Sequence, residues 1–216
     1  MSDWKLKYII AGTGRCGTGY TSRLVTELGS DCGHEDIFGP YGVWHERLSK
    51  FDGDCSWMSI PYLNQFDGKI VHLVRDPLKV MRSKIATRWP LLDYLDNGHS
   101  RAYSRFALSV VPYEDDDIWS YNLRFYVKWN RLIEKFSGFR VRVERLRYIY
   151  GASDLATFLG FPRLSSTVLA EACKRASRSG ENKHVTSGPN LSWEDFPDSK
   201  ERDEAMSMAY SYGYPV

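Results

Sequence analysis

Four glycines and one arginine lie within residues 12–19, near the start of the chain, in an arrangement suited to binding an anion. Residues 8–11 are apolar and predict a buried strand, and residues 20–28 predict a helix with one apolar face. Glycines let backbone N–H groups converge, and a helix N-terminus adds a partial positive charge. Because Arg15 adds a full charge within the same loop, we expect a site for a phosphate-like group here.

Two nucleotide-binding signatures fit this loop in part. The pattern GxxxxGK[ST] has its glycine spacing twice within residues 12–19, but Thr18 and Tyr20 occupy the lysine positions. Because that lysine reaches the β- and γ-phosphates, its absence argues against an ATP or GTP enzyme. The dinucleotide pattern GxGxxG matches literally, with Glu35 at the distance of a ribose-binding acid, although Arg15 would crowd the pyrophosphate. A tight glycine turn that binds nothing is the third alternative.

A second candidate anion site follows the next apolar strand. Residues 69–75 predict a core strand that ends at Arg75, and Asp76 is a candidate N-cap with Pro77 at the first helical position. Ser83 would then lie two turns into the helix. An arginine offers two parallel hydrogen bonds and a serine hydroxyl offers a third, so both side chains could bind one phosphate.

Composition narrows the class of protein. The chain has 216 residues, of which 43% are hydrophobic, so we expect one domain spanning residues 1–216. With 29 basic and 27 acidic residues the net charge is +2, which argues against a general nucleic-acid binder. Four cysteines without zinc-type spacing predict neither a metal site nor a disulfide scaffold. We see no signal peptide and no apolar run of about 18 residues, so we expect a cytoplasmic protein without a membrane span.

Strands that alternate with helices predict parallel strands in an α/β sheet. Residues 36–54 and 91–117 show little periodicity and are expected to be irregular. We expect a helix to start near Ser56, with Pro61 tolerated only within its first turn. The remaining expected elements are strands at 8–11, 30–35, 69–75 and 139–143, and helices at 20–28, 77–88, 118–136, 154–159, 165–177 and 201–210.

Residues 14–20 (Gly-Arg-Cys-Gly-Thr-Gly-Tyr) resemble the 5′-phosphosulfate loop of sulfotransferases, in which a lysine or arginine precedes a Ser/Gly-Gly-Thr step. Residues 71–83 resemble the family's 3′-phosphate element, in which a serine follows the strand-end arginine by eight positions. Weaker resemblances lie at residues 141–146, 154–160, 190–196 and 210–214. Residues 36–68 and 89–117 have no counterpart in the family pattern, and acceptor specificity would be built there.

The resemblance implies a three-layer α/β fold, with a central parallel sheet flanked by helices, of the P-loop NTPase-like sulfotransferase type. It is closer to the glycosaminoglycan-type group than to the cytosolic group. It also implies transfer of a sulfuryl group from 3′-phosphoadenosine 5′-phosphosulfate (PAPS), without a metal, leaving adenosine 3′,5′-bisphosphate. The acceptor would be a hydroxyl or amine of a small molecule or carbohydrate. The implied cofactor-binding residues are Gly14, Arg15, Cys16, Gly17, Thr18, Gly19, Tyr20, Arg75, Ser83 and Lys183.

Three residues are candidates for the chemical step. Arg15 would stabilise the departing 5′-phosphate, because its charge is permanent. Glu35 matches the position of the base in glycosaminoglycan-type sulfotransferases. His34 is the alternative base, since its ordinary pKa lies closer to neutrality than that of a free glutamate. Two other functions stay open: a small-molecule kinase with a divergent P-loop, and a nucleotide-binding module that has lost turnover.

Overall fold

The structure is a computed structural model that describes residues 4–86, 101–114, 117–178 and 190–216. The chain divides into two compact units. The first comprises Met1–Arg75 and Leu132–Glu181, and the second comprises Asp76–Arg131 and Asn182–Val216. Each unit is described below by itself.

A five-stranded sheet forms the centre of the first unit, with the strand order β2-β5-β1-β6-β7. Every neighbouring pair in this sheet is parallel. The central strand is buried throughout, as expected for an apolar strand with neighbours on both sides. The strands are β1 (Tyr8–Gly12), β2 (Cys32–Gly33), β5 (Gly53–Cys55), β6 (Lys69–Val74) and β7 (Phe139–Arg142).

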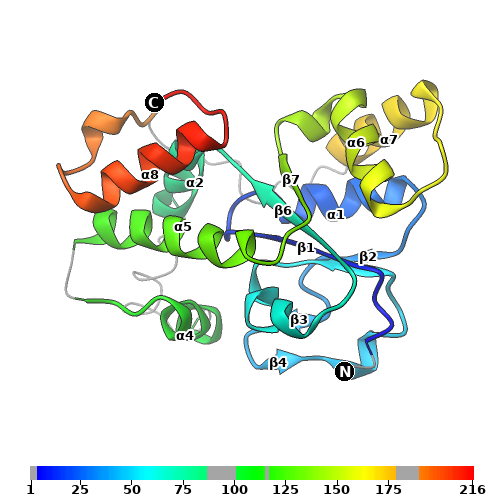
Figure 1. Cartoon of the computed structure of the whole chain (residues 1–216), viewed down its shortest axis with the longest axis horizontal. Helices are drawn as coiled ribbons and strands as arrows, with labels where there is room; N and C mark the ends of the chain where they lie inside the picture. The colour runs from blue at the N-terminus through cyan, green and yellow to red at the C-terminus, as the bar shows by residue number, and fades with distance from the viewer. Residues whose placement is uncertain (1–3, 87–100, 115–116, 179–189) are drawn as a thin grey trace. The chain divides into compact units, whose positions relative to one another are not determined.

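Helices cover one face of this sheet, and a hairpin with 3₁₀ turns lies on the other (Figure 1). Because the sheet is parallel and flanked by helices, the expected α/β class is confirmed. The helices on the first face are α1 (Thr18–Glu27), α6 (Ile149–Leu159) and α7 (Ser166–Arg178). The other parts of this unit are β3 (Phe38–Gly39), β4 (Gly42–Val43), η1 (His45–Arg47), η2 (Trp57–Gln65) and η3 (Arg145–Arg147).

The second unit is helical in its described part and is held by aromatic packing. The rings of Phe125 and Trp129 stack at 4.4 Å, and Phe106 meets Trp129 edge to face. Lys84 is fully buried with its ammonium group 3.8 Å from the centre of the Phe125 ring. The elements are α2 (Pro77–Ala86), α4 (Arg101–Val110), α5 (Ile118–Glu134, which ends in the first unit), η4 (Trp193–Asp195) and α8 (Lys200–Ser211).

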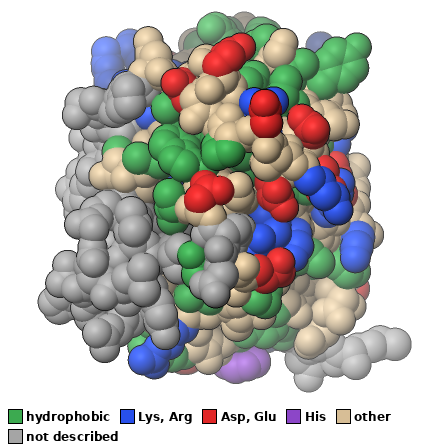
Figure 2. All heavy atoms as spheres, turned by 90° about the vertical axis from the view of Figure 1, so that its left-hand side faces the viewer, with side chains coloured by type: hydrophobic (Ala, Val, Ile, Leu, Met, Phe, Trp, Pro, Cys, Tyr) green, Lys and Arg blue, Asp and Glu red, His purple; other side chains and the backbone are tan. Residues whose placement is uncertain are grey.

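Charged side chains of both signs are interspersed on the molecular face in Figure 2. Within the second unit, Arg131 pairs with Glu204 at 3.2 Å, and Lys200 reaches the same carboxylate at 3.8 Å. These partly exposed pairs contribute little stability each. They do show that the nearly equal numbers of acidic and basic residues are mixed locally.

Several elements differ from the sequence expectations. Residues 36–54 were expected to be irregular, but they contain the β3–β4 hairpin and the start of the core strand β5. Residues 91–117 were expected to lack periodic structure, but α4 lies within them. Pro61 lies in the middle of η2, beyond the first turn, and the tighter 3₁₀ winding accommodates it there. Helix α6 begins at Ile149, five residues before its expected start.

The capping predictions agree with the structure. Asp76 Oδ1 accepts the amide of Leu78 at 2.9 Å, and Pro77 is the first residue of α2. The Ser56 hydroxyl accepts the amide of Met58 at 3.1 Å, at the start of η2. Short polar side chains in these positions satisfy amides that have no partner within the helix.

Candidate active site

The glycine loop between β1 and α1 is a tight turn whose shape requires its glycines. A Cβ atom on Gly12 would lie 2.5 Å from the carbonyl oxygen of Leu73, so this close approach to β6 excludes a side chain. Gly17 has φ 100° and directly precedes α1, where a Cβ would meet Val143 at 2.7 Å. The turn closes through the Cys16 amide, which donates to the Thr13 carbonyl at 3.1 Å.

Two arginine side chains converge on this loop. The guanidinium of Arg75, just past the end of β6, donates to the backbone carbonyl of Arg15 at 2.8 Å. The pKa of Arg15 is lowered by burial and by the charge of Arg75, and Glu35 opposes this shift. Arg15 itself adopts φ 75°, in the left-handed region that non-glycine residues seldom occupy. A polyvalent anion bound here would relieve the repulsion between the two guanidinium groups.

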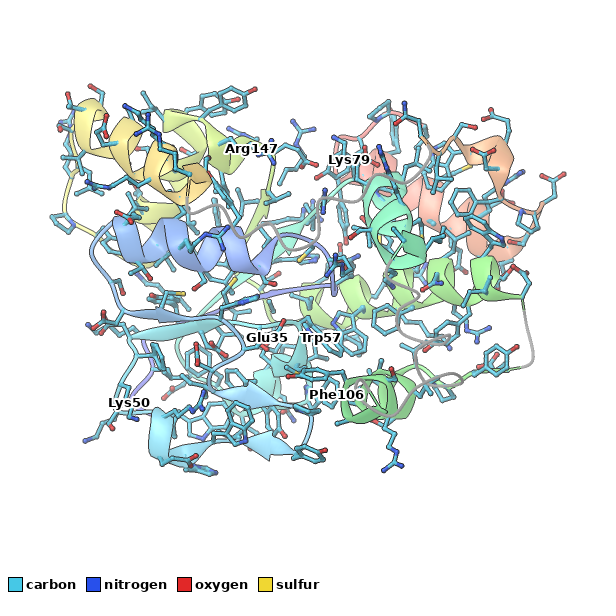
Figure 3. All side chains as sticks on the ribbon, turned by 180° about the vertical axis from the view of Figure 1, so that it is seen from behind. Glu35, Lys50, Trp57, Lys79, Phe106 and Arg147 are labelled. Atoms are coloured by element: carbon cyan, nitrogen blue, oxygen red, sulfur yellow. The ribbon has the colours of Figure 1, made fainter. Side chains whose placement is uncertain are left out.

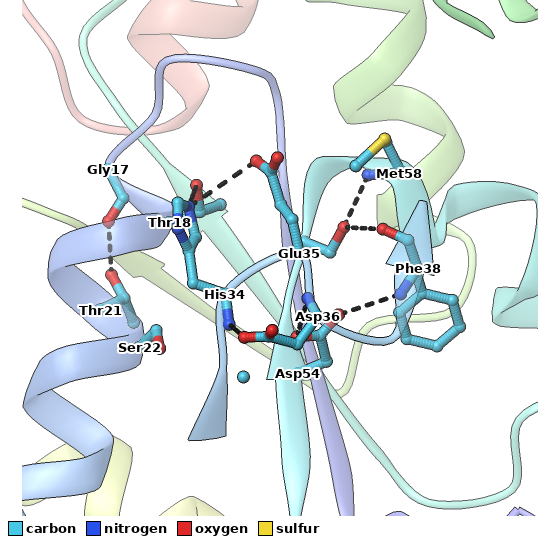
Figure 4. A network of polar contacts seen from close by, with 12 residues as sticks. Gly17, Thr18, Thr21, Ser22, His34, Glu35, Asp36, Phe38, Asp54 and Met58 are labelled. Carbon is cyan, nitrogen blue, oxygen red and sulfur yellow. Dashed lines mark hydrogen bonds and ion pairs between the residues drawn. The ribbon is translucent and has the colours of Figure 1, made fainter. Parts of the chain in front are cut away.

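His34 and Glu35 follow strand β2 and lie against the first turn of α1 (Figure 4). The Thr18 hydroxyl and His34 Nε2 are hydrogen-bonded at 3.2 Å, and Nε2 lies 3.7 Å from Glu35 Oε1. A Cβ on Gly19 would lie 3.2 Å from the His34 ring, so glycine leaves room for the imidazole. The structure therefore brings both candidate bases to the anion loop.

The carboxylate of Glu35 is mostly enclosed, with 23% of the side chain exposed. It lies beside Trp57, which hydrogen-bonds to it (Figure 3). Burial raises the pKa of Glu35 to about 7, and the charges of Asp54 and Asp36 add to the rise, whereas Arg15 and Trp57 oppose it. A carboxylate with this pKa is a competent proton acceptor near neutral pH.

His34 shifts in the opposite direction. Burial lowers its pKa, as does the charge of Arg23, and Asp36 opposes the change. By their ordinary pKa values, histidine would be better matched than glutamate to accept a proton near neutral pH. In the folded protein the pKa of Glu35 lies above that of His34, because burial disfavours the charged form of each group.

Asp54, in strand β5, belongs to the same site and was missed from the sequence. It is fully buried, and its carboxylate accepts the amides of the segment that follows Glu35. The sequence signal is weak, because a three-residue strand is too short to show alternation and the surrounding stretch was expected to be irregular. The pKa of Asp54 is raised to about 6 by burial, which the three backbone hydrogen bonds oppose.

Cys16 and Tyr20 are fixed by internal contacts. The Cys16 thiol is buried, and burial raises its pKa to about 12, so it stays protonated. The Tyr20 hydroxyl donates to the Leu146 carbonyl at 3.0 Å, which also accepts from the Cys173 thiol at 3.5 Å. Beside these contacts is an open groove of about 480 Å³, lined by Arg147, Tyr148, Ile149, Tyr150, Ala170, Cys173, Lys174 and Ser177.

The remaining predicted residues lie elsewhere or outside the description. Ser83 is buried in α2, within the second unit. Lys183 lies outside the described residues. Among the residues that the structure describes, no group of three or more potential ligands could hold a metal ion. Across the same residues, no helix has the length and apolar character needed to span a membrane.

Comparisons with known proteins support the fold. Neither a family model nor a curated protein matches the chain. Among solved structures, it is similar to mouse sulfotransferase SULT7A1 complexed with PAP, with a TM-score of 0.50 and 12% sequence identity. The match covers 96% of this chain and 84% of that one. The protein therefore has a sulfotransferase-like fold.

Proposed function

We propose that this protein is a PAPS-dependent sulfotransferase that transfers a sulfuryl group to a hydroxyl or amine of a small molecule or carbohydrate. The observation that carries the proposal is the meeting of two arginines and a glycine loop with a carboxylate of raised pKa. The structural neighbour is described as a sulfotransferase in complex with PAP, which agrees with a nucleotide of this class. We propose that residues 1–216 act as one functional domain.

The glycine loop and α1 would bind the 5′-phosphosulfate. Amides in the first turn of a helix have no partner within the helix, and the helix dipole favours an anion there. Thr18 and Gly19 begin this turn, and the Thr18 hydroxyl would add a further contact. Arg15 would neutralise the charge that develops on the 5′-phosphate as the bond to sulfur breaks.

Glu35 would accept the proton of the acceptor. The acceptor oxygen or nitrogen would attack the sulfur atom of bound PAPS, with loss of the bond between sulfur and the bridging phosphate oxygen. The electron pair of that bond would stay on the 5′-phosphate, and the Glu35 carboxylate would take the acceptor proton. Hydrogen bonding between His34 and Thr18 would keep the imidazole beside the loop and the carboxylate. The proposed transfer step uses no metal, and the proposed cofactor is PAPS alone.

Arg75 would bind the 3′-phosphate, and the roles of Ser83 and Lys183 there stay predictions from the sequence pattern alone. The hydrogen bond from Arg75 to the Arg15 carbonyl supports this assignment in part, because it ties Arg75 to the loop that would hold the other end of the nucleotide. The amides of Gly14 to Gly19 would share the 5′ end, except for that of Cys16, which is used within the turn.

The nucleobase would lie against Tyr20, near the groove lined by Tyr148 and Tyr150. The Tyr20 side chain meets Ser177 and Cys173, both of which line the groove. Stacking of a base on an aromatic ring contributes about 1–3 kcal/mol. A planar base beside Tyr20 would therefore account for a polar ring immediately after the anion loop.

Transfer is expected to depend on pH with a midpoint near 7. The rate should rise with pH, because the pKa of Glu35 is about 7 and only the ionised carboxylate accepts the proton. Rates at limiting acceptor, measured from about pH 5 to 9, report this midpoint for the free enzyme. A midpoint below the ordinary value for histidine would instead assign the base to His34, whose pKa is lowered.

Replacing Tyr20 with alanine is expected to weaken binding of adenosine 3′,5′-bisphosphate by about tenfold, because the stacking surface is lost. Tyr20→Phe keeps the ring and removes the hydroxyl that donates to Leu146, so affinity should stay within about twofold. Calorimetry measures both. Equal losses in the two variants would contradict stacking and assign the effect to the hydrogen bond.

The reaction class itself is tested with radiolabelled PAPS and a panel of sugar, phenol, amine and lipid acceptors. Magnesium-independent binding of adenosine 3′,5′-bisphosphate and transfer of labelled sulfate would support the proposal. A requirement for ATP and magnesium would favour a kinase instead. Binding without transfer to any acceptor would favour a nucleotide-binding module.

A further inference from the structure

The segment after β2 is held in place by one buried carboxylate. Asp54 Oδ1 accepts the amide of Asp36 at 3.3 Å, and Oδ2 accepts the amides of Ile37 and Phe38 at 3.4 and 3.3 Å. Figure 4 shows these contacts beside Glu35. Because Asp54 is fully buried, its charge is balanced by these donors instead of by water.

The residue before this segment has a strained backbone. Glu35 has φ 60°, in the left-handed region that non-glycine residues seldom occupy. Such a conformation persists where the surrounding structure determines it. The three amides that Asp54 accepts belong to the residues immediately after Glu35, so their hydrogen bonds set its direction.

Close packing of Gly33 against Asp54 supports the same role. A Cβ atom on Gly33 would lie 2.5 Å from Asp54 Oδ1, so the carboxylate fits against the strand only because this residue is glycine. The partly exposed Asp36 carboxylate holds the same segment by accepting the His34 amide at 3.0 Å and pairing with Arg47 at 2.9 Å. The chain from 33 to 38 is thus fixed by one buried and one partly exposed carboxylate.

We propose that Asp54 is a positioning residue for the proposed transfer, which fixes the backbone after Glu35 so that the Glu35 carboxylate faces His34 and Arg15. This inference rests on the proposed function, because it concerns the base of that reaction. Asp54 makes no proposed contact with PAPS or the acceptor.

Asp54 also acts on Glu35 through its charge. Among the described residues, the groups that act on Glu35 include Arg15 and Cys16 from the glycine loop, His34 and Asp36 from its own segment, Trp57 from η2, and Asp54 and Cys55 from β5. After burial, the charge of Asp54 is the largest cause of the raised pKa of Glu35. Its removal should lower that pKa and leave a weaker base.

The test is Asp54→Asn, which keeps the size of the side chain but removes its charge and places an NH₂ group among amide donors. Hydrogen exchange at the amides of Asp36, Ile37 and Phe38 should become at least about tenfold faster. In carbon-13-labelled protein, the titration midpoint of the Glu35 carboxyl should move to lower pH. The transfer rate constant should fall at least about tenfold, while the KM for PAPS stays within about twofold.

Two further variants separate the effects. Asp52→Asn removes a carboxylate two residues away, which pairs with Lys7 at the surface, and should leave the exchange rates and the Glu35 midpoint unchanged. Gly33→Ala should displace the Asp54 carboxylate while keeping its charge. Gly33→Ala should accelerate hydrogen exchange at the amides of Asp36, Ile37 and Phe38. It tests the same role if Asp54→Asn does not fold.

The proposal is overturned if Asp54→Asn and Gly33→Ala leave exchange at the three amides unchanged. It is also overturned if Asp54→Asn lowers thermal stability without moving the Glu35 midpoint, since that is the result of a purely structural role. Exchange and titration need no substrate. If the wild-type protein transferred no sulfate, the proposed function would fail while these two measurements still decided the role of Asp54.

Discussion

Replacing Glu35 with glutamine is expected to reduce sulfuryl transfer by at least about a hundredfold, because the proton acceptor is removed. Binding of adenosine 3′,5′-bisphosphate should persist, since the loop, Arg15 and Arg75 are retained. Transfer assays and calorimetry on the same preparation measure the two effects. Retained turnover in Glu35→Gln would move the base to His34 or to another residue.

The same variant is expected to be more stable than the wild type at alkaline pH. The pKa of Glu35 rises from 4.5 to about 7 on folding, so between these values the folded protein keeps a proton that the unfolded chain releases. The free energy of unfolding therefore falls as pH rises through this window. Above this pH window, burial of the ionised Glu35 carboxylate lowers the free energy of unfolding by about 3 kcal/mol at most. Glutamine carries no such cost.

Thermal unfolding at about pH 4 and pH 8 tests this expectation. Glu35→Gln should match the wild type at the lower pH and exceed its melting temperature by several degrees at the higher pH. Glu46→Gln, which changes an exposed glutamate in η1, is the control and should not show this pattern. Equal melting temperatures of wild type and Glu35→Gln at pH 8 would mean that Glu35 is not strained by burial of its charge.

Replacing Arg75 with alanine is expected to weaken binding of adenosine 3′,5′-bisphosphate by about 1.5 kcal/mol or more, which is at least tenfold, because a charge-assisted contact is lost. Calorimetry without magnesium measures the change. Arg140 lies on β7 and is an exposed partner of Glu134, so Arg140→Ala should leave the affinity unchanged. An unchanged affinity in Arg75→Ala would end the 3′-phosphate assignment.

Adenosine 5′-monophosphate separates two roles of Arg75. Its guanidinium already donates to the Arg15 carbonyl, so its removal also loosens the glycine loop. If Arg75 contacts the 3′-phosphate, the variant should lose affinity for the bisphosphate and little for the monophosphate. Equal losses for both nucleotides would mean that Arg75 acts by supporting the loop alone.

The parts of the fold that follow from sequence are those whose signals are local. The unit of β1, glycine loop and α1 combines an apolar run with clustered glycines, and β6 leads directly into Asp76 and Pro77. Strand β5 carries no such signal, because it is placed by pairing with β1, 45 positions earlier in the chain, and with β2, 21 positions earlier. Its place in the sheet is set by long-range pairing, which no local pattern contains.

The candidate site divides in the same way. Arg15, His34 and Glu35 were expected at the candidate site from residue type, position and the family resemblance, and the three lie near one another in the structure. Which of His34 and Glu35 is the better base could not be found, because burial sets their pKa values and burial depends on the whole fold. Asp54 was missed because it lies in β5, a strand that is set by long-range pairing and leaves no local sequence signal.

The central position of β1 has a consequence for synthesis of the chain. The glycine loop leaves the ribosome before β5 and β6, the two strands that flank β1 in the sheet. Arg75 reaches the Arg15 carbonyl only once β6 has paired. The nascent chain therefore carries the residues of its anion site through a long interval in which that site does not exist.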